Sequence, residues 1–397
     1  MKRFFVVSLL FFVHTLFAAT PYTILISFDG FRWDYANRGL SPNIQQLQQR
    51  GISALSLRPA FPSKTFPNHY TIVTGMEPEH HGIIGNDFIN SANGKKYKYT
   101  DTLSSRESEW YNGEAIWETA RKNKIITASY FWPGSEVNDE TRRPNYYEKY
   151  FHTRPYSERV DGVIKWLQLP IEKRPKLITL YFDATDWQGH RYGPNSEEVN
   201  TAIQQLDSTL GYLINNLKEI QMYDSTNIII VSDHGMSEVS KERVIDIKTM
   251  IEEYEVEVEW DGPLMMLEPK DKNNKEKIFK ILQTNESHYK AYTKETIPSY
   301  YHFSEHPFIY SIILVAETGW SLKNKKSPVF GRGNHGYDKN SLEMHGIFAA
   351  TGPSFKEGYA AGTIWNIDIY PLLCKILNIS PNKNIDGKLE RIEYILK

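Results

Sequence analysis

Short apolar segments alternate along this chain with segments in which apolar residues recur every three or four positions. The short segments are rich in β-branched residues and end in polar or Gly residues, which is typical of buried strands that lead into loops. Strands are expected at 23–28, 177–182, 227–232 and 346–350. Helices are expected at 42–50, 114–122, 197–217 and 367–377. This alternation predicts an α/β fold with a mostly parallel central sheet and helices on both faces.

The segment 239–326 interrupts this alternation. It is rich in charged residues, so it is expected to form an α+β insertion with surface loops. Its Lys residues are interpreted as solvent-exposed, and the formal net charge of the chain is only −2. Neither feature indicates binding to a nucleic-acid polymer. Because the polar motifs described below lie on both sides of this segment and must converge, 20–397 is expected to be a single catalytic domain.

Residues 1–19 have the order of a secretory signal peptide. Two basic residues at 2–3 precede an apolar stretch at 4–17, and two small residues follow at 18–19. The stretch is shorter than the roughly 20 residues that span a bilayer. No later segment approaches that length, so no membrane span is expected after cleavage. With one cysteine, Cys374, a secreted protein cannot form an internal disulfide.

Carboxylates and imidazoles gather just after the expected strands and in one later Gly-rich segment. The residues concerned are Asp29, Asp183, Asp186, His190, Asp233, His234 and His335. In open α/β sheets, ligands bind at the carboxyl ends of the strands. A single Asp in such a place is usually a turn or helix cap. The whole set is harder to explain in that way, because carboxylate and imidazole are ligands that zinc accepts, and three of each suffice for two zinc ions.

Thr65 lies where a loop is expected to give way to a helix. Pro67 falls in the first turn, where its fixed backbone angle is favourable and its missing N–H costs no hydrogen bond. The free N–H groups of such a turn bind anions, phosphate included. A threonine hydroxyl attacks only when its proton is removed. Two metal ions held close together supply that activation for phosphoryl transfer, so Thr65 is predicted to be a nucleophile.

The order of these motifs resembles that of the nucleotide pyrophosphatase/phosphodiesterases, the type I phosphodiesterase family of the alkaline phosphatase superfamily. The segments that carry the resemblance are Asp29, KTFPNHY with Thr65, GIIGN with Asn86, Asp186 with His190, SDHGM and GNHGYD. The resemblance implies an alkaline-phosphatase-like fold and two zinc ions per chain. Animal members of this family are rich in cysteine, so the single cysteine indicates a bacterial member, secreted to the periplasm.

The resemblance also implies a role for each motif residue. The ligands are Asp186, His190 and His335 for one zinc ion, and Asp29, Asp233 and His234 for the other. Thr65 would bridge the metals as nucleophile, and Asn86 would donate its amide to a phosphate oxygen. Many relatives read Glu-Pro-Asp-Ser where this chain reads Ala-Thr-Asp-Trp. The retained spacing to His190 favours Asp186 over Asp183 as the ligand, and Asp183 is interpreted as a strand-end cap or a residue that supports a ligand.

Aromatic residues are the candidates for holding the substrate. Phe66 follows the nucleophile, and Tyr150 lies in a segment that resembles the family's source of a second ring, so the two could sandwich a nucleobase. Tyr181 and Trp132 are weaker candidates, with core packing as the alternative for all four. The implied substrate is a small-molecule nucleotide or other phosphodiester, cleaved to release a nucleoside monophosphate.

Other chemistries use the same scaffold. A choline-type head group in an aromatic cage is the main competing diester substrate. A phosphate monoesterase would need extra cations, for which Lys64 and Arg106 are candidates. A sulfatase would mature Cys or Ser at the nucleophile position, where this chain has Thr65. A catalytically inactive binding protein would be expected to lack some of the ligands, and all six are present.

Overall fold

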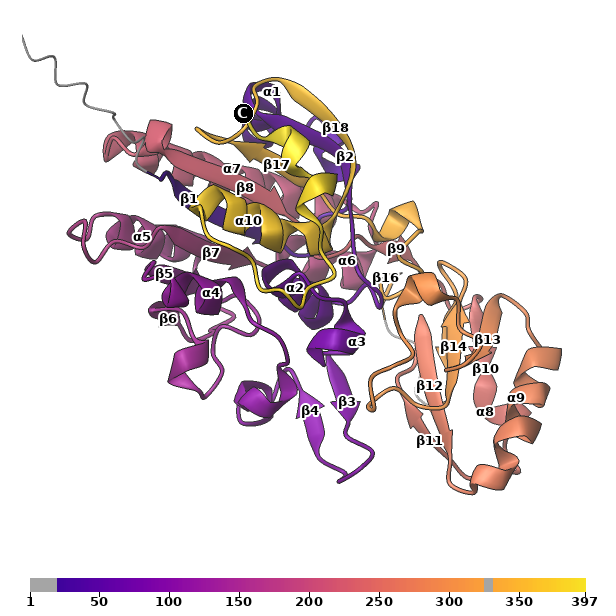
Figure 1. Ribbon diagram of the computed structural model, residues 1–397. Coiled ribbons are helices and arrows are strands. Elements are labelled where there is room, and N and C mark those ends of the chain that lie inside the picture. The colour runs from indigo at the N-terminus through magenta and orange to yellow at the C-terminus, as the bar shows by residue number, and fades with distance from the viewer. Residues whose placement is uncertain (1–19, 325–330) are drawn as a thin grey trace, which may run out of the picture.

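The computed structural model describes residues 20–324 and 331–397. The main sheet has eight strands in the order β18-β2-β17-β8-β1-β7-β5-β6 (Figure 1). Their bounds are β1 (Tyr22–Phe28), β2 (Ile52–Arg58), β5 (Thr127–Tyr130), β6 (Tyr146–Glu148), β7 (Leu177–Phe182), β8 (Thr226–Val231), β17 (Phe348–Thr351) and β18 (Tyr359–Trp365). The predicted signal peptide at 1–19 and the last two residues of the predicted insertion, 325–326, lie outside the described residues.

The remaining strands are short or belong to smaller sheets. They are β3 (Asp87–Ile89), β4 (Lys96–Lys98), β9 (Ser237–Glu238), β10 (Val244–Asp246), β11 (Val256–Glu259), β12 (Leu264–Pro269), β13 (Tyr289–Thr293), β14 (Ile312–Ala316), β15 (Ser321–Lys323) and β16 (Gly333–Asn334). The α-helices are α1 (Pro42–Arg50), α2 (Thr65–Thr74), α3 (Pro78–His81), α4 (Ile116–Lys122), α5 (Tyr156–Leu167), α6 (Ala184–Tyr192), α7 (Glu197–Glu219), α8 (Ile247–Met250), α9 (Lys275–Thr284) and α10 (Ile369–Leu377).

The main sheet is mostly parallel, as expected. β1 pairs in parallel with β8 and β7, β5 pairs in parallel with β7 and β6, and β18 does so with β2. β17 is the exception and runs antiparallel to both β8 and β2. The chain enters β17 from the segment that contains His335, at the carboxyl edge of the parallel strands, so it crosses the sheet in the opposite direction.

Side chains of the central strands alternate between two hydrophobic cores, one on each face of the sheet. Leu25 of β1 and Ile229 of β8 belong to the core covered by α2, α4 and α10. Ile24 and Ile228 belong to the core covered by α1, α5 and α7. All four side chains are fully buried. This two-faced burial explains why the strands read as continuous apolar runs, and it confirms the predicted α/β architecture.

The segment expected to interrupt the fold forms an antiparallel sheet, β11-β12-β14-β13, with α8 and α9 (Figure 1). One face of this sheet, including Met265 and Leu314, forms a core with Ile278 of α9. The other face, including Met266 and Ile313, joins the core on the α2 face of the main sheet. The segment is therefore α+β and packs on the rest of the chain. That it is an insertion at 239–326 within a single catalytic domain stays a prediction.

Two predicted helix boundaries shift for local reasons. The helix expected from 114 begins at Ile116, where the Glu118 carboxylate accepts a hydrogen bond from the Ala115 N–H (3.2 Å) and so caps the helix start. The helix expected at 197–217 extends to Glu219 and begins at a Ser196 cap, whose hydroxyl accepts from Val199 N. Within 20–324 and 331–397, no helix is long and apolar enough to cross a membrane.

Gly235 holds the loop after β8 close to the chain that enters β17. A Cβ on Gly235 would lie 2.1 Å from the backbone oxygen of Glu343 and 2.7 Å from that of His345.

We expect Gly235→Ala to lower the free energy of unfolding by about 1–3 kcal/mol, since backbone must move. Gly362→Ala is the matched control, because a Cβ there meets nothing within 4 Å. Urea unfolding with chelator present measures both, and equal losses would contradict this account.

Candidate metal centre and substrate cavity

Three buried carboxylates meet at the carboxyl edge of the main sheet. Asp29 directly follows β1, and Asp233 lies two residues beyond the end of β8. Asp186 lies on α6, the helix that follows β7. Because β8, β1 and β7 are adjacent and parallel, their ends bring these residues together. Asp29 and Asp233 are almost fully buried. This is unusual for carboxylates, and among residues 20–324 and 331–397 no Lys or Arg pairs with either of them.

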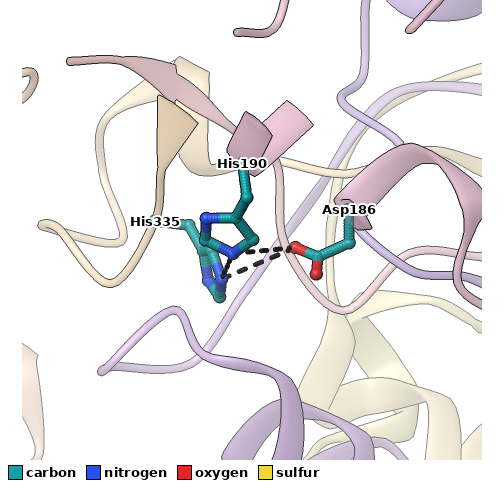
Figure 2. Close-up of side chains that lie close together, drawn as sticks. All are labelled: Asp186, His190 and His335. Carbon is teal, nitrogen blue, oxygen red and sulfur yellow. Dashed lines mark hydrogen bonds and ion pairs between the residues drawn. The ribbon is translucent and has the colours of Figure 1, made fainter. Parts of the chain in front are cut away.

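Three imidazoles complete the cluster. His190 lies one turn after Asp186 on α6, and its Nε2 is 3.4 Å from Asp186 Oδ1. His335 follows β16, which pairs with β9, and its Nε2 is 3.6 Å from Asp186 Oδ1 and 3.1 Å from His190 Nε2. Figure 2 shows these three side chains pointing toward one another. The His234 ring stacks on that of His335 with centroids 3.5 Å apart.

Each imidazole is oriented by a backbone carbonyl. The Nδ1 groups of His190, His234 and His335 donate to Gly333 O (3.0 Å), Gly235 O (2.7 Å) and Ser63 O (2.8 Å) respectively. This fixes the tautomer and leaves the Nε2 lone pair of each ring facing the carboxylates, as is usual for metal-ligating histidine. Burial, followed by the nearby His234, holds the pKa of His335 well below its usual value, so this ring is neutral.

The carboxylates lack the donors that their burial requires. Asp29 Oδ1, Asp186 Oδ1 and Asp233 Oδ2 are buried, and none accepts a hydrogen bond within the described residues. Burial and then the charges of Asp233 and Asp186 raise the pKa of Asp29 well above its usual value. An uncompensated cluster of this kind is costly unless a cation joins it. Its donor set of carboxylate oxygen and imidazole nitrogen fits zinc.

The geometry defines two overlapping ligand groups. Within each group, the ligand atoms all lie within 4.8 Å of one another. One group is Asp186, His190 and His335, and the other is Asp29, Asp186 and His234. Asp233 lies beside the second group, with its Oδ2 3.1 Å from His234 Nε2. All six residues expected as ligands therefore lie in one cluster, with Asp186 between the two groups.

Asp183 lies away from this cluster. Its carboxylate accepts a hydrogen bond from the Tyr156 hydroxyl (3.0 Å) and lies 3.0 Å from His152 Nδ1 and 3.5 Å from Arg159 Nη1. Arg159 is fully buried and donates to the Tyr181 carbonyl at the end of β7. Asp183 is thus engaged in joining α5 to β7, which agrees with its interpretation as a supporting residue.

Thr65 begins α2 and points at the cluster. Its Oγ1 lies 3.3 Å from His234 Nε2. His69, one turn later, receives no assignment from the sequence, yet it fixes the start of this helix. Its Nδ1 donates to the Thr65 carbonyl (2.9 Å) and its Nε2 meets Ser27 Oγ of β1 (2.8 Å). A histidine four residues after a threonine in an apolar helix carries no distinctive sequence signal.

Asn86 lies directly beside this helix start. Its Oδ1 accepts a hydrogen bond from the Phe66 backbone N–H at 3.0 Å. This orients the side chain and leaves the amide N–H groups of Asn86 to face the cavity. An amide held in this way is suited to donate to a phosphoryl oxygen beside Thr65.

A cavity of about 580 Å³ opens above the cluster, within the range of small-molecule sites. Phe66 and Tyr150 both line it, and Tyr150 is 46% exposed. Tyr181 and Trp132 also line it, but each is nearly buried and has a structural partner. The Tyr181 hydroxyl donates to Asp29 Oδ2 (2.5 Å), and the Trp132 indole N–H donates to the His69 carbonyl (3.0 Å). Their predicted role in substrate binding stays a prediction.

Further residues line the cavity that the sequence did not identify as substrate contacts. They include Tyr99, Glu136, His152, Trp187 and Arg191. Arg106, considered only as a cation for a monoesterase, also lines the cavity, and its guanidinium pairs with Glu136. The positive charge of Arg106 is therefore already partly balanced, which weakens the case for a monoester site.

Comparison with known proteins agrees with this geometry. The type I phosphodiesterase/nucleotide pyrophosphatase family model matches residues 23–338. The chain is 37% identical over 393 residues to human ectonucleotide pyrophosphatase/phosphodiesterase family member 1, covering 95% of this chain and 42% of that protein. It is 34% identical over 381 residues to the bis(5'-adenosyl)-triphosphatase of Xenopus laevis, covering 96% of this chain and 82% of that one. The chain thus spans less than half the length of the human relative.

Solved structures show the same fold. Murine ectonucleotide pyrophosphatase/phosphodiesterase 5 superposes with a TM-score of 0.90 at 31% identity, covering 95% of this chain and all of that one. An inactive threonine-to-alanine variant of the murine protein, solved in complex with AMP, matches equally well. The expected alkaline-phosphatase-like fold is confirmed, and so is the expected family. The chain belongs to the type I phosphodiesterase/nucleotide pyrophosphatase family.

Proposed function

We propose that this protein is a zinc-dependent hydrolase that cleaves phosphodiester or pyrophosphate bonds of nucleotides and releases nucleoside monophosphates. The observation that carries the proposal is the meeting of three buried, donor-free carboxylate oxygens and three oriented Nε2 atoms beside the Thr65 hydroxyl. The names of the relatives and the AMP complex of the murine protein support nucleotides as substrates.

We further propose two zinc ions. Asp186, His190 and His335 would hold one, and Asp29, Asp233 and His234 the other. When bound, the ions would lower the pKa of the Thr65 hydroxyl and balance the negative charge that develops on the phosphoryl group. The overlap at Asp186 allows neighbouring metals to share one cluster. The pKa of Asp29 is raised by burial and then by the charges of Asp233 and Asp186, a repulsion that the ions would relieve.

The reaction follows from the placement of Thr65. Its oxygen attacks phosphorus, the bond to the leaving group breaks, and the phosphoryl group with its nucleoside becomes attached to Thr65. Water then attacks the same phosphorus, which releases the nucleoside monophosphate and restores the threonine. Throughout, the Asn86 amide donates to a phosphoryl oxygen.

The base is proposed to lie between Phe66 and Tyr150. Tyr150 is held in place by ring contacts with Phe131 and Tyr181, at centroid distances of 5.2 and 6.3 Å, while much of its surface faces the cavity. Phe66 packs on Tyr99 on another part of the wall (5.4 Å). Because neighbouring rings already hold Phe66 and Tyr150 in place, a planar base could bind between them without a rearrangement of either side chain.

The location of the protein is proposed from the sequence. The basic, apolar and small residues of 1–19 support secretion, and the single cysteine supports a bacterial periplasmic enzyme. The relatives described above are animal proteins and do not indicate a bacterial source.

Metal content tests the proposed centre. We expect two zinc ions per chain by elemental analysis and a higher melting temperature with zinc than with chelator, because ligand binding to the native state adds stability. His335→Ala should lose about one zinc ion, since it removes one of the three ligands of a site. His288→Ala is the matched control, because His288 is exposed and pairs with Glu317. Fewer than one zinc ion per active wild-type chain would contradict the proposal.

Replacement of Thr65 tests the covalent route. Thr65→Ala should lower kcat by several orders of magnitude on a nitrophenyl ester of a nucleoside monophosphate, with zinc content retained, while Thr65→Ser should keep much of the rate. Acid quenching followed by peptide mass spectrometry should detect the nucleotide on Thr65. Thr201→Ala on α7 controls for loss of a threonine hydroxyl elsewhere. Near-normal turnover by Thr65→Ala would mean that water attacks directly.

Replacement of Tyr150 tests where the base lies. Tyr150→Ala should raise KM for the nucleotide ester about tenfold to a hundredfold, the value of one lost stacking contact. Methyl nitrophenyl phosphate, which has no base, should be affected much less. Nitrophenyl phosphorylcholine, run in parallel, tests the competing choline-type substrate. Tyr212→Ala, which removes an exposed ring from α7, is the matched control. Equal losses on both phosphodiesters would make Tyr150 a packing residue.

A further inference from the structure

Arg159 is a buried cation behind the aromatic wall of the cavity. It lies on α5, and its side chain is fully buried. In the described part of the chain it is not among the residues that line the cavity, so it would not touch a bound nucleotide. Arginine is seldom buried completely unless its charge and its N–H groups have partners. The partners of this guanidinium therefore show what its burial achieves.

The guanidinium joins two segments of the chain that meet at the cavity. Its Nη1 donates to the Tyr181 carbonyl at the end of β7 (2.9 Å). Its Nη2 and Nε donate to the carbonyls of His152 and Arg154, at 3.2 Å each. These two carbonyls belong to the loop 149–155, which connects β6 to α5 and is exposed except at Arg154. One buried side chain thus holds an exposed loop against the central sheet.

Asp183 balances the charge of Arg159. Its Oδ1 lies 3.5 Å from Arg159 Nη1, and its Oδ2 lies 3.0 Å from His152 Nδ1. The carboxylate therefore meets the side chain of the same residue whose carbonyl the guanidinium binds. Removal of one member of a buried ion pair leaves the other charge unpaired, which is costly. The pair and the loop are consequently held in one arrangement.

Tyr150, which is proposed to stack on the base, lies in this loop. Its backbone N–H donates to Glu136 Oε1 (2.6 Å), and Arg159 holds the loop two residues later, at the His152 carbonyl. Phe131, whose ring supports that of Tyr150 at 5.2 Å, also packs on Arg159, with the guanidinium carbon 5.0 Å from the ring centroid. Arg159 therefore contacts both the loop that carries Tyr150 and the ring on which Tyr150 rests.

We propose that Arg159, with Asp183 as its counter-ion, is the residue that positions Tyr150 for nucleoside binding. A ring that is already ordered receives a base at lower cost, because ordering it on binding consumes free energy. Lysine would keep the charge, but its single nitrogen lacks the planar fork that reaches carbonyls on two segments. Arg159 thus acts on the binding of the base and not on phosphorus. This inference rests on the proposed nucleotide hydrolase function.

The kinetic test applies Arg159→Lys to a phosphodiester with a base and to one without. KM for the nitrophenyl ester of a nucleoside monophosphate should rise about tenfold, with kcat within about twofold, because the loop loses its fixed position. Both constants for methyl nitrophenyl phosphate should stay within about twofold. An equal rise in KM for the two phosphodiesters would overturn the proposal.

Arg174→Lys is the matched control. Arg174 also donates to a carbonyl, that of Leu169 (3.0 Å), and its guanidinium also packs on a ring, that of Tyr22. It precedes β7 and so lies at the end of the strand opposite to the cluster. Its replacement should leave KM for both phosphodiesters unchanged.

A double-variant cycle shows whether Arg159 acts through Tyr150. Arg159→Lys should add nothing to the KM of Tyr150→Ala for the nucleotide ester, since the ring that it positions is gone. Additive effects of the two changes would overturn the proposal. If Arg159→Lys does not fold, Asp183→Asn takes its place in the same cycle, because it keeps the size of the side chain and removes the charge.

Trypsin reports on the loop independently of turnover. Lys149 is exposed at the start of the loop, so a loop released from Arg159 should be cut after this residue. Mass spectrometry should show this cut about tenfold faster in Arg159→Lys than in the wild-type protein or Arg174→Lys. Equal rates in all three would overturn the anchoring. Failure of the wild-type protein to hydrolyse the nucleotide ester would instead reject the proposed function, and the cleavage rates would still decide whether Arg159 holds the loop.

Discussion

The structure depends on a concentration of carboxylates that no Lys or Arg of the described residues pairs with. Asp29, Asp186 and Asp233 converge where adjacent parallel strands end, and each keeps a buried oxygen without a donor. Burying carboxylates in this way is costly in the absence of a cation. The surrounding imidazoles are held by backbone carbonyls through Nδ1 and turn their Nε2 atoms toward the carboxylates, as a cation site requires.

Thr65, the proposed nucleophile, is tied to the same cluster by backbone contacts. The Ser63 carbonyl accepts from His335, the Thr65 carbonyl accepts from His69, and Asn86 accepts from the Phe66 N–H. The loop that precedes α2 therefore orients one ligand while it also places the hydroxyl. A disturbance of the ligands should move Thr65, and a disturbance of the helix start should move His335. The positions of Thr65 and of the proposed ligand His335 are therefore coupled by the chain itself.

The sequence predicted the features that have a strong local signature. The strand expected at 177–182 and the helix expected at 42–50 match β7 and α1 residue for residue. The six residues expected as ligands from the order of the motifs lie in one cluster in the structure. Strand direction has no such signature, so the antiparallel course of β17 did not follow from its composition. β18 was missed because most of its residues are exposed, which leaves no apolar run to detect.

Substrate-binding residues were harder to predict than metal ligands. The sequence does not distinguish an aromatic residue that packs in the core from one that binds substrate. Trp132 lines the cavity, yet its indole N–H is committed to the His69 carbonyl. Trp187 lines the same cavity and is far more exposed, a difference that its sequence context does not reveal.

The most direct test of the account is anomalous diffraction at the zinc edge from crystals of the zinc-loaded protein. We predict two peaks about 3.5–4 Å apart, the separation typical of two-metal phosphoryl-transfer sites. One peak should lie among Asp186, His190 and His335, and the other beside Asp29, Asp233 and His234, with Thr65 Oγ1 next to the second. A single peak, or two peaks that do not contact these side chains, would contradict the account.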